Sequence, residues 1–207
     1  MAMAKNYQKT ARSYFQEGQV NAISNRACTE TTCRQYQIDG VLAGIQAMEK
    51  LLYPLWKADS QSLEDFHRQL LGVVSDALLA SGVHRLRIAL NDAALAAAAP
   101  LAQQHTQAAM DAMLSLWVDS SVYRQRQEAI IKQVAGRYHG YLVTESEPLV
   151  NTLYPEVAGE RTYGMCQVVF LQRPERLSYE AWLEIWHDSH TQVAIDTQST
   201  FAYRQNV

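Results

Sequence analysis

Cysteine is scarce in this chain, and neither sign of charge is in clear excess. The 207 residues include three cysteines, too few for a disulfide framework at this length. Cys28 and Cys33 form a single CxxxxC pair with no second pair to complete a zinc shell, and Cys166 is expected to pack in the core. The 18 Lys and Arg against 21 Asp and Glu give a formal charge of -3. This balance provides no broad cationic field for nucleic acid or anionic lipid, so neither is expected as a partner.

Long apolar runs and familiar catalytic signatures are also missing. The longest segment without formal charge, residues 93–110, is rich in weakly apolar alanine and contains Pro100, so no membrane span is expected. The N-terminus carries Lys5, Lys9 and Arg12 without a following apolar core, which argues against a secretory signal and for a cytoplasmic protein. No GxSxG, HExxH, P-loop or GxGxxG occurs, so nucleotide-binding and serine-hydrolase functions lose their usual support and no cofactor is implied.

The chain is 48% hydrophobic and 19% charged, a globular balance, and its apolar pattern becomes regular from residue 48 onward. Alternation and apolar runs predict strands over 51–56, 83–90, 110–118 and 138–143, with helices from the Ser62 cap to Gly82 and over about 123–136. The order βαββαβ is that of a ferredoxin-like α+β unit, with both helices on one face of an antiparallel sheet. We expect the other face to be apolar and to need a cover.

The pattern divides the chain into four parts. Residues 1–47 follow no clear period and are predicted to be an extension outside the fold, residues 48–150 form the first repeat, and residues 151–163 link it to residues 164–207. In this last part the run from Ser178 to Trp182 echoes the run from Ser62 to Phe66, which indicates an internal duplication. The second repeat is partial, because the sequence ends near its second strand.

The helix expected over 178–194 carries the candidate site. At about 100° per residue, its apolar residues share an arc of about 120° that includes Trp182, Trp186 and His190. His187 falls at the flank of this arc and Asp188 on its polar side. An imidazole among indoles is desolvated, which lowers its pKa and leaves a neutral base near pH 7.

Each of these features has a second interpretation. His190 could be a core histidine bonded to backbone, and the two tryptophans could be sheet-facing core. His187 and His190 are spaced for metal binding, but no other ligand is placed to complete a shell, so no metal is predicted. Arg204 is kept as a candidate contact for an anion at the edge of a pocket.

A longer stretch resembles the EthD domain family. The resemblance is carried by a strand and Pro-containing turn with an aromatic residue, a Trp-x-x-x-His motif, and a later Tyr with Gln-Asn: residues 167–182, then Trp186, His190 and Tyr203-Arg204-Gln205-Asn206. It covers about 165–207, and residues 48–150 look like the degenerate first repeat of longer members. That repeat has Leu70 and Val74 where the second has Trp186 and His190.

The resemblance implies a dimeric α+β barrel fold, in which two ferredoxin-like sheets pack face to face. Relatives act as decarboxylases, cyclases or cofactor-free oxygenases, or serve as accessory proteins of oxidative degradation. We therefore expect a small hydrophobic or aromatic carbonyl compound as ligand, with an oxidoreductase or proton-transfer reaction. His190 would be catalytic, and Trp182, Trp186 and Tyr203 would bind the substrate. A non-catalytic ligand-binding protein is the alternative, and self-association is left open.

Overall fold

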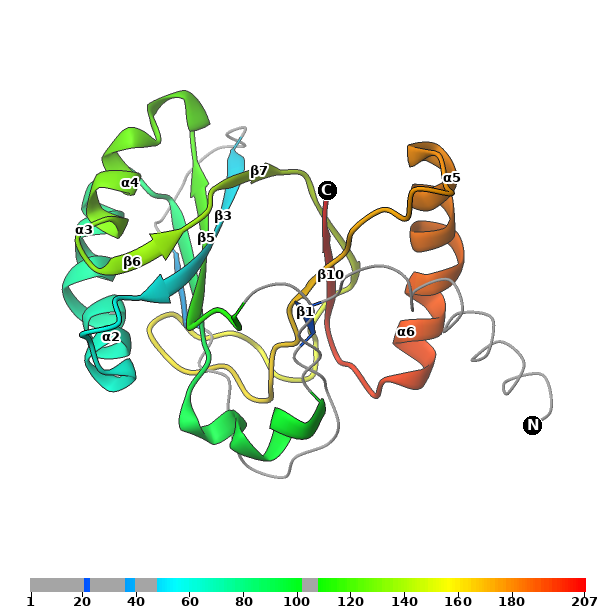
Figure 1. Cartoon of the computed structure of the whole chain (residues 1–207), viewed down its shortest axis with the longest axis horizontal. Helices are drawn as coiled ribbons and strands as arrows, with labels where there is room; N and C mark the ends of the chain where they lie inside the picture. The colour runs from blue at the N-terminus through cyan, green and yellow to red at the C-terminus, as the bar shows by residue number, and fades with distance from the viewer. Residues whose placement is uncertain (1–20, 23–35, 40–47, 102–107) are drawn as a thin grey trace.

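The computed structural model describes residues 21–22, 36–39, 48–101 and 108–207, and Figure 1 shows the whole chain. Its strands are β1 (Asn21–Ala22), β2 (Tyr36–Asp39), β3 (Glu49–Lys57), β4 (Arg85–Leu90), β5 (Ala112–Val118), β6 (Ala135–Tyr138), β7 (Tyr141–Val143), β8 (Glu145–Leu149), β9 (Val169–Phe170) and β10 (Tyr203–Asn206). Its helices are α2 (Leu63–Gln69), η1 (Leu70–Val74), α3 (Ser75–Ala80), η2 (Ala93–Leu101), η3 (Ser121–Tyr123), α4 (Gln125–Ile131), α5 (Tyr179–Glu184), η4 (Ile185–His190) and α6 (Thr191–Thr197).

The main sheet has the strand order β2-β4-β5-β3-β6, with β7 also paired to β3. Every pairing in it is antiparallel. Each strand predicted over 48–150 is present, although the last one is split into β6 and β7. Pro54 of β3 has no N–H to donate, and the split falls beside it, at residues 139–140. The mixed α+β class is confirmed.

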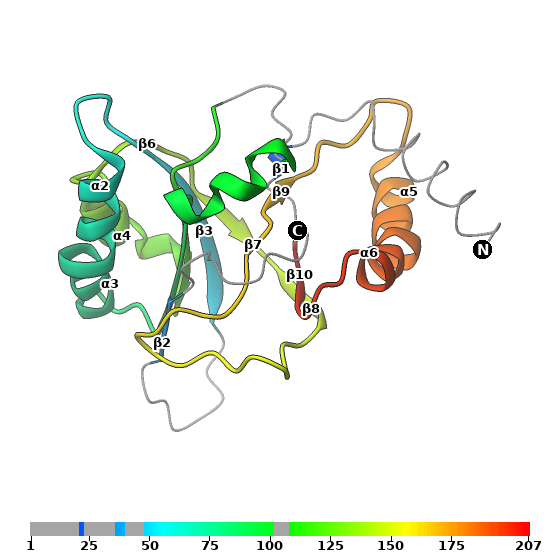
Figure 2. The same ribbon diagram turned by 90° about the horizontal axis from the view of Figure 1, so that it is seen from below.

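Helices α2, α3 and α4 cover one face of this sheet, as Figure 2 shows from below. Ser62 begins the first of them, because its Oγ accepts a hydrogen bond from the Asp65 N–H at 3.0 Å. Phe66, Leu70 and Leu78 of this helical segment are fully buried. They form the core with alternate residues of the central strands, such as Leu51, Tyr53 and Leu55 of β3. This is the amphipathic packing that the sequence pattern predicts.

The opposite face of the sheet differs from the prediction of an apolar surface. It carries Lys50, Arg85 and Arg87 together with Trp117, and all but Arg85 of these side chains are buried. Lys50 and Arg85 are both cross-strand partners of Trp117. Their cations lie 4.9 Å and 4.6 Å from the centre of its indole ring. Charged and apolar residues alternate in β4 because both faces of the sheet are covered there: the apolar side chains face the helices, and the charged ones face the C-terminal part of the chain.

The C-terminal part of the chain lies on this second face (Figures 1 and 2). Strand β8 continues from β7 and pairs antiparallel with β10, and β9 pairs with β1. Residues 165–166 pack against the small cluster of Ala89 and Leu95, as Met113 of β5 does, which places Cys166 in apolar surroundings as expected. The helical segment 179–197 forms the outermost layer on this side.

Two segments contain elements other than those expected. Within residues 1–47, which the sequence predicts to be an extension, β1 pairs with β9 and β2 pairs with β4, and the rest of that range lies outside the described residues. The strand expected over 165–171 is reduced to the two residues of β9. Strand, helix and strand still follow one another over 164–207, in the predicted order.

Candidate functional site

The helix of the candidate site begins at Ser178, whose Oγ accepts a hydrogen bond from the Ala181 N–H at 3.1 Å. From there α5, η4 and α6 run without interruption to Thr197. The middle segment η4 is a π-helical turn, with wider spacing than the regular α-helix assumed from the sequence. Positions after this turn are therefore rotated relative to an ideal helical wheel.

Aromatic rings line one side of the helix. The ring centres of Trp182 and Trp186 lie 5.4 Å apart, and those of Tyr179 and Trp182 lie 5.9 Å apart. Trp186 is 9% exposed, whereas Trp182 is half-buried and Tyr179 is exposed. The two predicted tryptophans therefore form a pair, open to solvent at the Trp182 end. Trp186 also contacts His187, with ring centres 5.2 Å apart.

His190 is the last residue of the π turn and is half-buried. Burial lowers the pKa of its imidazole below the ordinary value, so the ring is neutral near pH 7. A neutral imidazole can accept a proton at one nitrogen and donate one at the other. His190 is thus a half-buried, neutral group on the same helix as the tryptophan pair.

Tyr203 comes to the site from β10. Burial raises the pKa of its hydroxyl, while the polar side-chain groups of Trp186 and Thr191 beside it act in the opposite direction. The hydroxyl of this predicted ligand contact is therefore engaged by the protein itself. It links the strand to the tryptophan pair.

Thr191 is a polar residue of the site that the sequence did not single out, and Gln205 appeared there only within the Tyr203-Arg204-Gln205-Asn206 run that carries the family resemblance. Gln205 is 2% exposed and donates through Nε2 to the Thr191 Oγ1 at 2.6 Å. Its amide oxygen accepts from the Ser146 hydroxyl of β8 at 3.1 Å. A single threonine or glutamine carries no spacing signal, which is why sequence reasoning missed this connection. This chain of hydrogen bonds, buried at Thr191 and Gln205 and exposed at Ser146, joins the helix to both strands of the small sheet.

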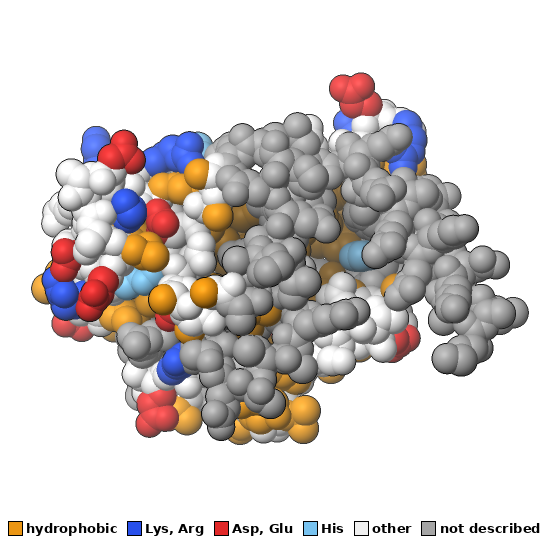
Figure 3. All heavy atoms as spheres, turned by 60° about the horizontal axis from the view of Figure 1, so that its bottom comes forward, with side chains coloured by type: hydrophobic (Ala, Val, Ile, Leu, Met, Phe, Trp, Pro, Cys, Tyr) orange, Lys and Arg blue, Asp and Glu red, His pale blue; other side chains and the backbone are white. Residues whose placement is uncertain are grey.

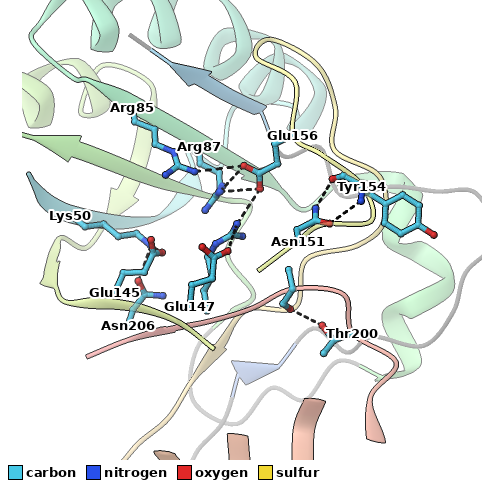
Figure 4. A network of polar contacts seen from close by, with 12 residues as sticks. Lys50, Arg85, Arg87, Glu145, Glu147, Asn151, Tyr154, Glu156, Thr200 and Asn206 are labelled. Atoms are coloured by element: carbon cyan, nitrogen blue, oxygen red, sulfur yellow. Dashed lines mark hydrogen bonds and ion pairs between the residues drawn. The ribbon is translucent and has the colours of Figure 1, made fainter. Parts of the chain in front are cut away.

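A second polar cluster lies between the main sheet and the C-terminal part (Figure 4). Glu156 accepts two hydrogen bonds from the Arg87 guanidinium, at 2.8 and 2.9 Å, and lies 3.8 Å from that of Arg85. Arg204 pairs with Glu147 at 2.8 Å and contacts Glu156 at 3.4 Å. The arginine considered for anion binding is thus already paired with carboxylates.

Lys50 completes this cluster on the other side. Its ammonium group pairs with Glu145 and donates to the Asn206 Oδ1 at 2.8 Å. Burial lowers the pKa of Lys50, and Glu145 opposes that shift. A buried ammonium is tolerated here because carboxylate and amide oxygens replace its water. The cluster fastens β3 to β8 and β10.

Several other expectations bear on the described residues. Residues 21–22, 36–39, 48–101 and 108–207 contain no group of three or more His, Cys, Asp or Glu that could hold a metal ion. Over the same part of the chain, no helix combines the length and apolar character needed to cross a bilayer. Figure 3 shows cationic and anionic side chains intermixed on the described part of one face, in keeping with the small net charge.

Comparisons with known proteins supply no family assignment. No family model matches this chain, and a search of curated proteins finds no significant match. The functional argument therefore rests on the geometry of the helix 179–197 and β10.

Proposed function

We propose that the helix 179–197 and β10 form the binding wall for a small hydrophobic compound that carries an aromatic ring or a carbonyl group. The observation that carries the proposal is the half-buried, neutral His190 on the same helix as the Trp182–Trp186 pair. Indole rings offer apolar surface for a ligand ring, and an imidazole supplies one polar group to orient it. This combination is typical of small-molecule sites.

The reaction we propose is proton transfer next to a carbonyl group. The neutral imidazole of His190 takes a proton from the carbon beside the carbonyl, and the electron pair of that C–H bond moves to the carbonyl oxygen as an enolate. The imidazolium then returns the proton to the same or another atom, as in isomerisation, or gives it to a hydroxyl group on the β-carbon, which leaves as water in a dehydration. In a decarboxylation the enolate forms instead by breaking the C–C bond to a carboxylate: CO2 leaves, the electron pair of that bond moves to the carbonyl oxygen, and protonated His190 supplies the proton that the carbon then takes up. If the protein is an oxidoreductase, we propose a related reaction in which dioxygen oxidises such an enolate without a cofactor.

We also propose that the chain is an EthD-like protein built from a ferredoxin-like repeat and a partial second repeat, of the dimeric α+β barrel type. The element order β3, α2–α3, β4, β5, α4, β6 and the antiparallel order β4-β5-β3-β6 support the first repeat. The capped helices after Ser62 and Ser178, each followed by a strand, support the second. The position of the C-terminal part against the far face of the main sheet supports the face-to-face arrangement.

A ligand-binding role without catalysis is the second candidate. The Tyr203 hydroxyl is already engaged by Trp186 and Thr191, which leaves His190 as the acid-base group among the predicted site residues. One such group suffices to orient a carbonyl oxygen by a hydrogen bond. In this role the protein would be an accessory protein of an oxidative or biosynthetic pathway.

The test uses the full chain and a panel of small aromatic aldehydes, ketones and acids. Binding is measured by calorimetry, and proton exchange beside the carbonyl is followed by NMR in D2O. We expect His190→Ala to lower the exchange rate at least about 100-fold, while His187→Ala, an exposed neighbour on the same helix, leaves it unchanged. Binding with no exchange in the wild type would favour the accessory role, and no binding by any compound would overturn both.

A further inference from the structure

The two long helical segments share an unusual turn. After the Ser62 cap, the first segment contains the π turn η1 and then Ser75, and after the Ser178 cap, the second contains η4 and then Thr191. Ser75 stands as far behind its cap as Thr191 stands behind its own. Both hydroxyl side chains are buried, with 3% and 7% of their surface exposed. A buried hydroxyl residue thus follows a π turn at the same place in each segment, although the backbone N–H of Ser75 bonds to the Gly72 carbonyl, only three residues earlier.

The bonds at Thr191 define the turn of the second segment. The backbone N–H of Thr191 donates to the Trp186 carbonyl, which lies five residues earlier, as a π turn requires. The Thr191 Oγ1 donates to the same carbonyl at 2.7 Å and accepts from Gln205 at 2.6 Å. One hydroxyl therefore holds the wide turn closed and ties it to β10.

The first segment lacks this tie. The Ser75 hydroxyl bonds within its own helix, to the carbonyls of Leu71 at 3.1 Å and Gly72 at 2.8 Å. The residue before it is Val74, a core side chain. In the second segment the corresponding residue is His190. The hydroxyl residue that bonds to a strand is thus Thr191, which follows His190, and not Ser75, which follows Val74.

We infer that Thr191 is a positioning residue, which fixes the orientation of His190 and Trp186 by holding the π turn against Gln205 of β10. An effect of Thr191 on catalysis rests on the proposed function, whereas its effect on the orientation of His190 does not. Without the hydroxyl, the buried Gln205 Nε2 loses its acceptor on Thr191, and the Trp186 carbonyl keeps only the bond from the Thr191 backbone N–H. The turn can then relax to ordinary α-helical bonding, which rotates the residues that follow Trp186.

The test compares Thr191→Val with Thr191→Ser and with Ser75→Ala as the matched control in the first segment. The readout is the imidazole titration of His190 by NMR in the full chain without ligand, assigned with His190→Ala. We expect Thr191→Val to raise the pKa of His190 toward its ordinary value by about 0.5 unit or more, because the ring becomes better solvated. Thr191→Ser should restore the wild-type titration, and Ser75→Ala should leave it unchanged.

Gln205→Met provides a second route if Thr191→Val does not fold, because it removes the strand's donor and keeps the threonine. It should raise the pKa of His190 in the same direction. An unchanged His190 titration in a folded Thr191→Val or Gln205→Met variant would overturn the inference, as would an equal shift in Ser75→Ala. Because this readout needs no ligand, a shifted titration together with an absence of compound binding would contradict the proposed function alone.

Discussion

Buried polar side chains are the residues that distinguish this molecule from a simple two-layer fold. Lys50 and Arg87 are strand residues of the main sheet, and each is only 5% exposed although it carries a charge. Each is paired with a carboxylate from a distant part of the chain, Lys50 with Glu145 and Arg87 with Glu156. His190 is buried on a helix and has a lowered pKa from that burial. A buried charge costs several kcal/mol when it loses its partner, so each pairing restricts how the chain can fold.

The burial of His190 should make the free energy of unfolding depend on pH. Its pKa in the folded chain lies below the ordinary 6.5, which the unfolded chain retains, so the unfolded state binds more protons as the pH falls below about 6.5. Stability is lost over that window, and the loss is complete below the folded pKa. We expect His190→Asn to remove this part of the loss, so that the wild type weakens relative to the variant between about pH 7.5 and 5.

Urea unfolding at a series of pH values measures this difference. His187→Asn, at an exposed position on the same helix, is the control. If the gap between wild type and His190→Asn stayed constant across the series, the burial of the imidazole would have no effect on its protonation.

At the scale of elements, each helical segment is determined by its start. Both begin at a serine whose hydroxyl accepts a backbone N–H three residues later, at Asp65 and at Ala181. Both then widen into a π turn, which brings the following residues to a position that a regular helix would not give them. The cap is a local feature of the sequence, whereas the turn depends on what packs beside it.

The caps make a matched pair of predictions. We expect Ser62→Ala and Ser178→Ala each to lower the free energy of unfolding by about 1 kcal/mol, because one N–H at each helix start loses its acceptor. Ser62→Asp and Ser178→Asp keep an acceptor oxygen and should remain close to wild type. Urea denaturation followed by circular dichroism measures all four variants. Equal losses in the alanine and aspartate variants would show that capping is not the cause.

At the scale of the whole molecule, charged contacts join the C-terminal part to the main sheet. Glu156 contacts Arg85, Arg87 and Arg204, and its side chain is 10% exposed. Lys50 pairs with Glu145 at the other end of the same interface (Figure 4). This interface therefore differs from the helix-covered face, where the contacts are apolar.

Removing the central carboxylate should loosen the C-terminal part first. We expect Glu156→Gln to destabilise the contact of β8 and β10 with the sheet by about 3 kcal/mol, because the buried Arg87 loses its counter-charge. Hydrogen exchange should accelerate in β8 and β10, while β3 and β5 keep wild-type protection. Glu160→Gln, at an exposed position nearby, is the control. Uniform acceleration across the chain would contradict a separate opening of this interface.

The local pattern of the sequence by itself determined the order of the four strands and two helices expected within residues 51–143, the helix start at Ser178, and the placement of His190 on the same helix as two tryptophans. These follow from periodicity and capping, which act over a few residues. Only the tertiary structure decided that Lys50 and Arg87 are buried, that Arg204 serves Glu147 and Glu156, and that Thr191 joins Gln205. Such contacts depend on segments far apart in the chain, where one sequence carries no signal of distance. The π turn belongs to the same group, because its bonding reflects the strand packed against it.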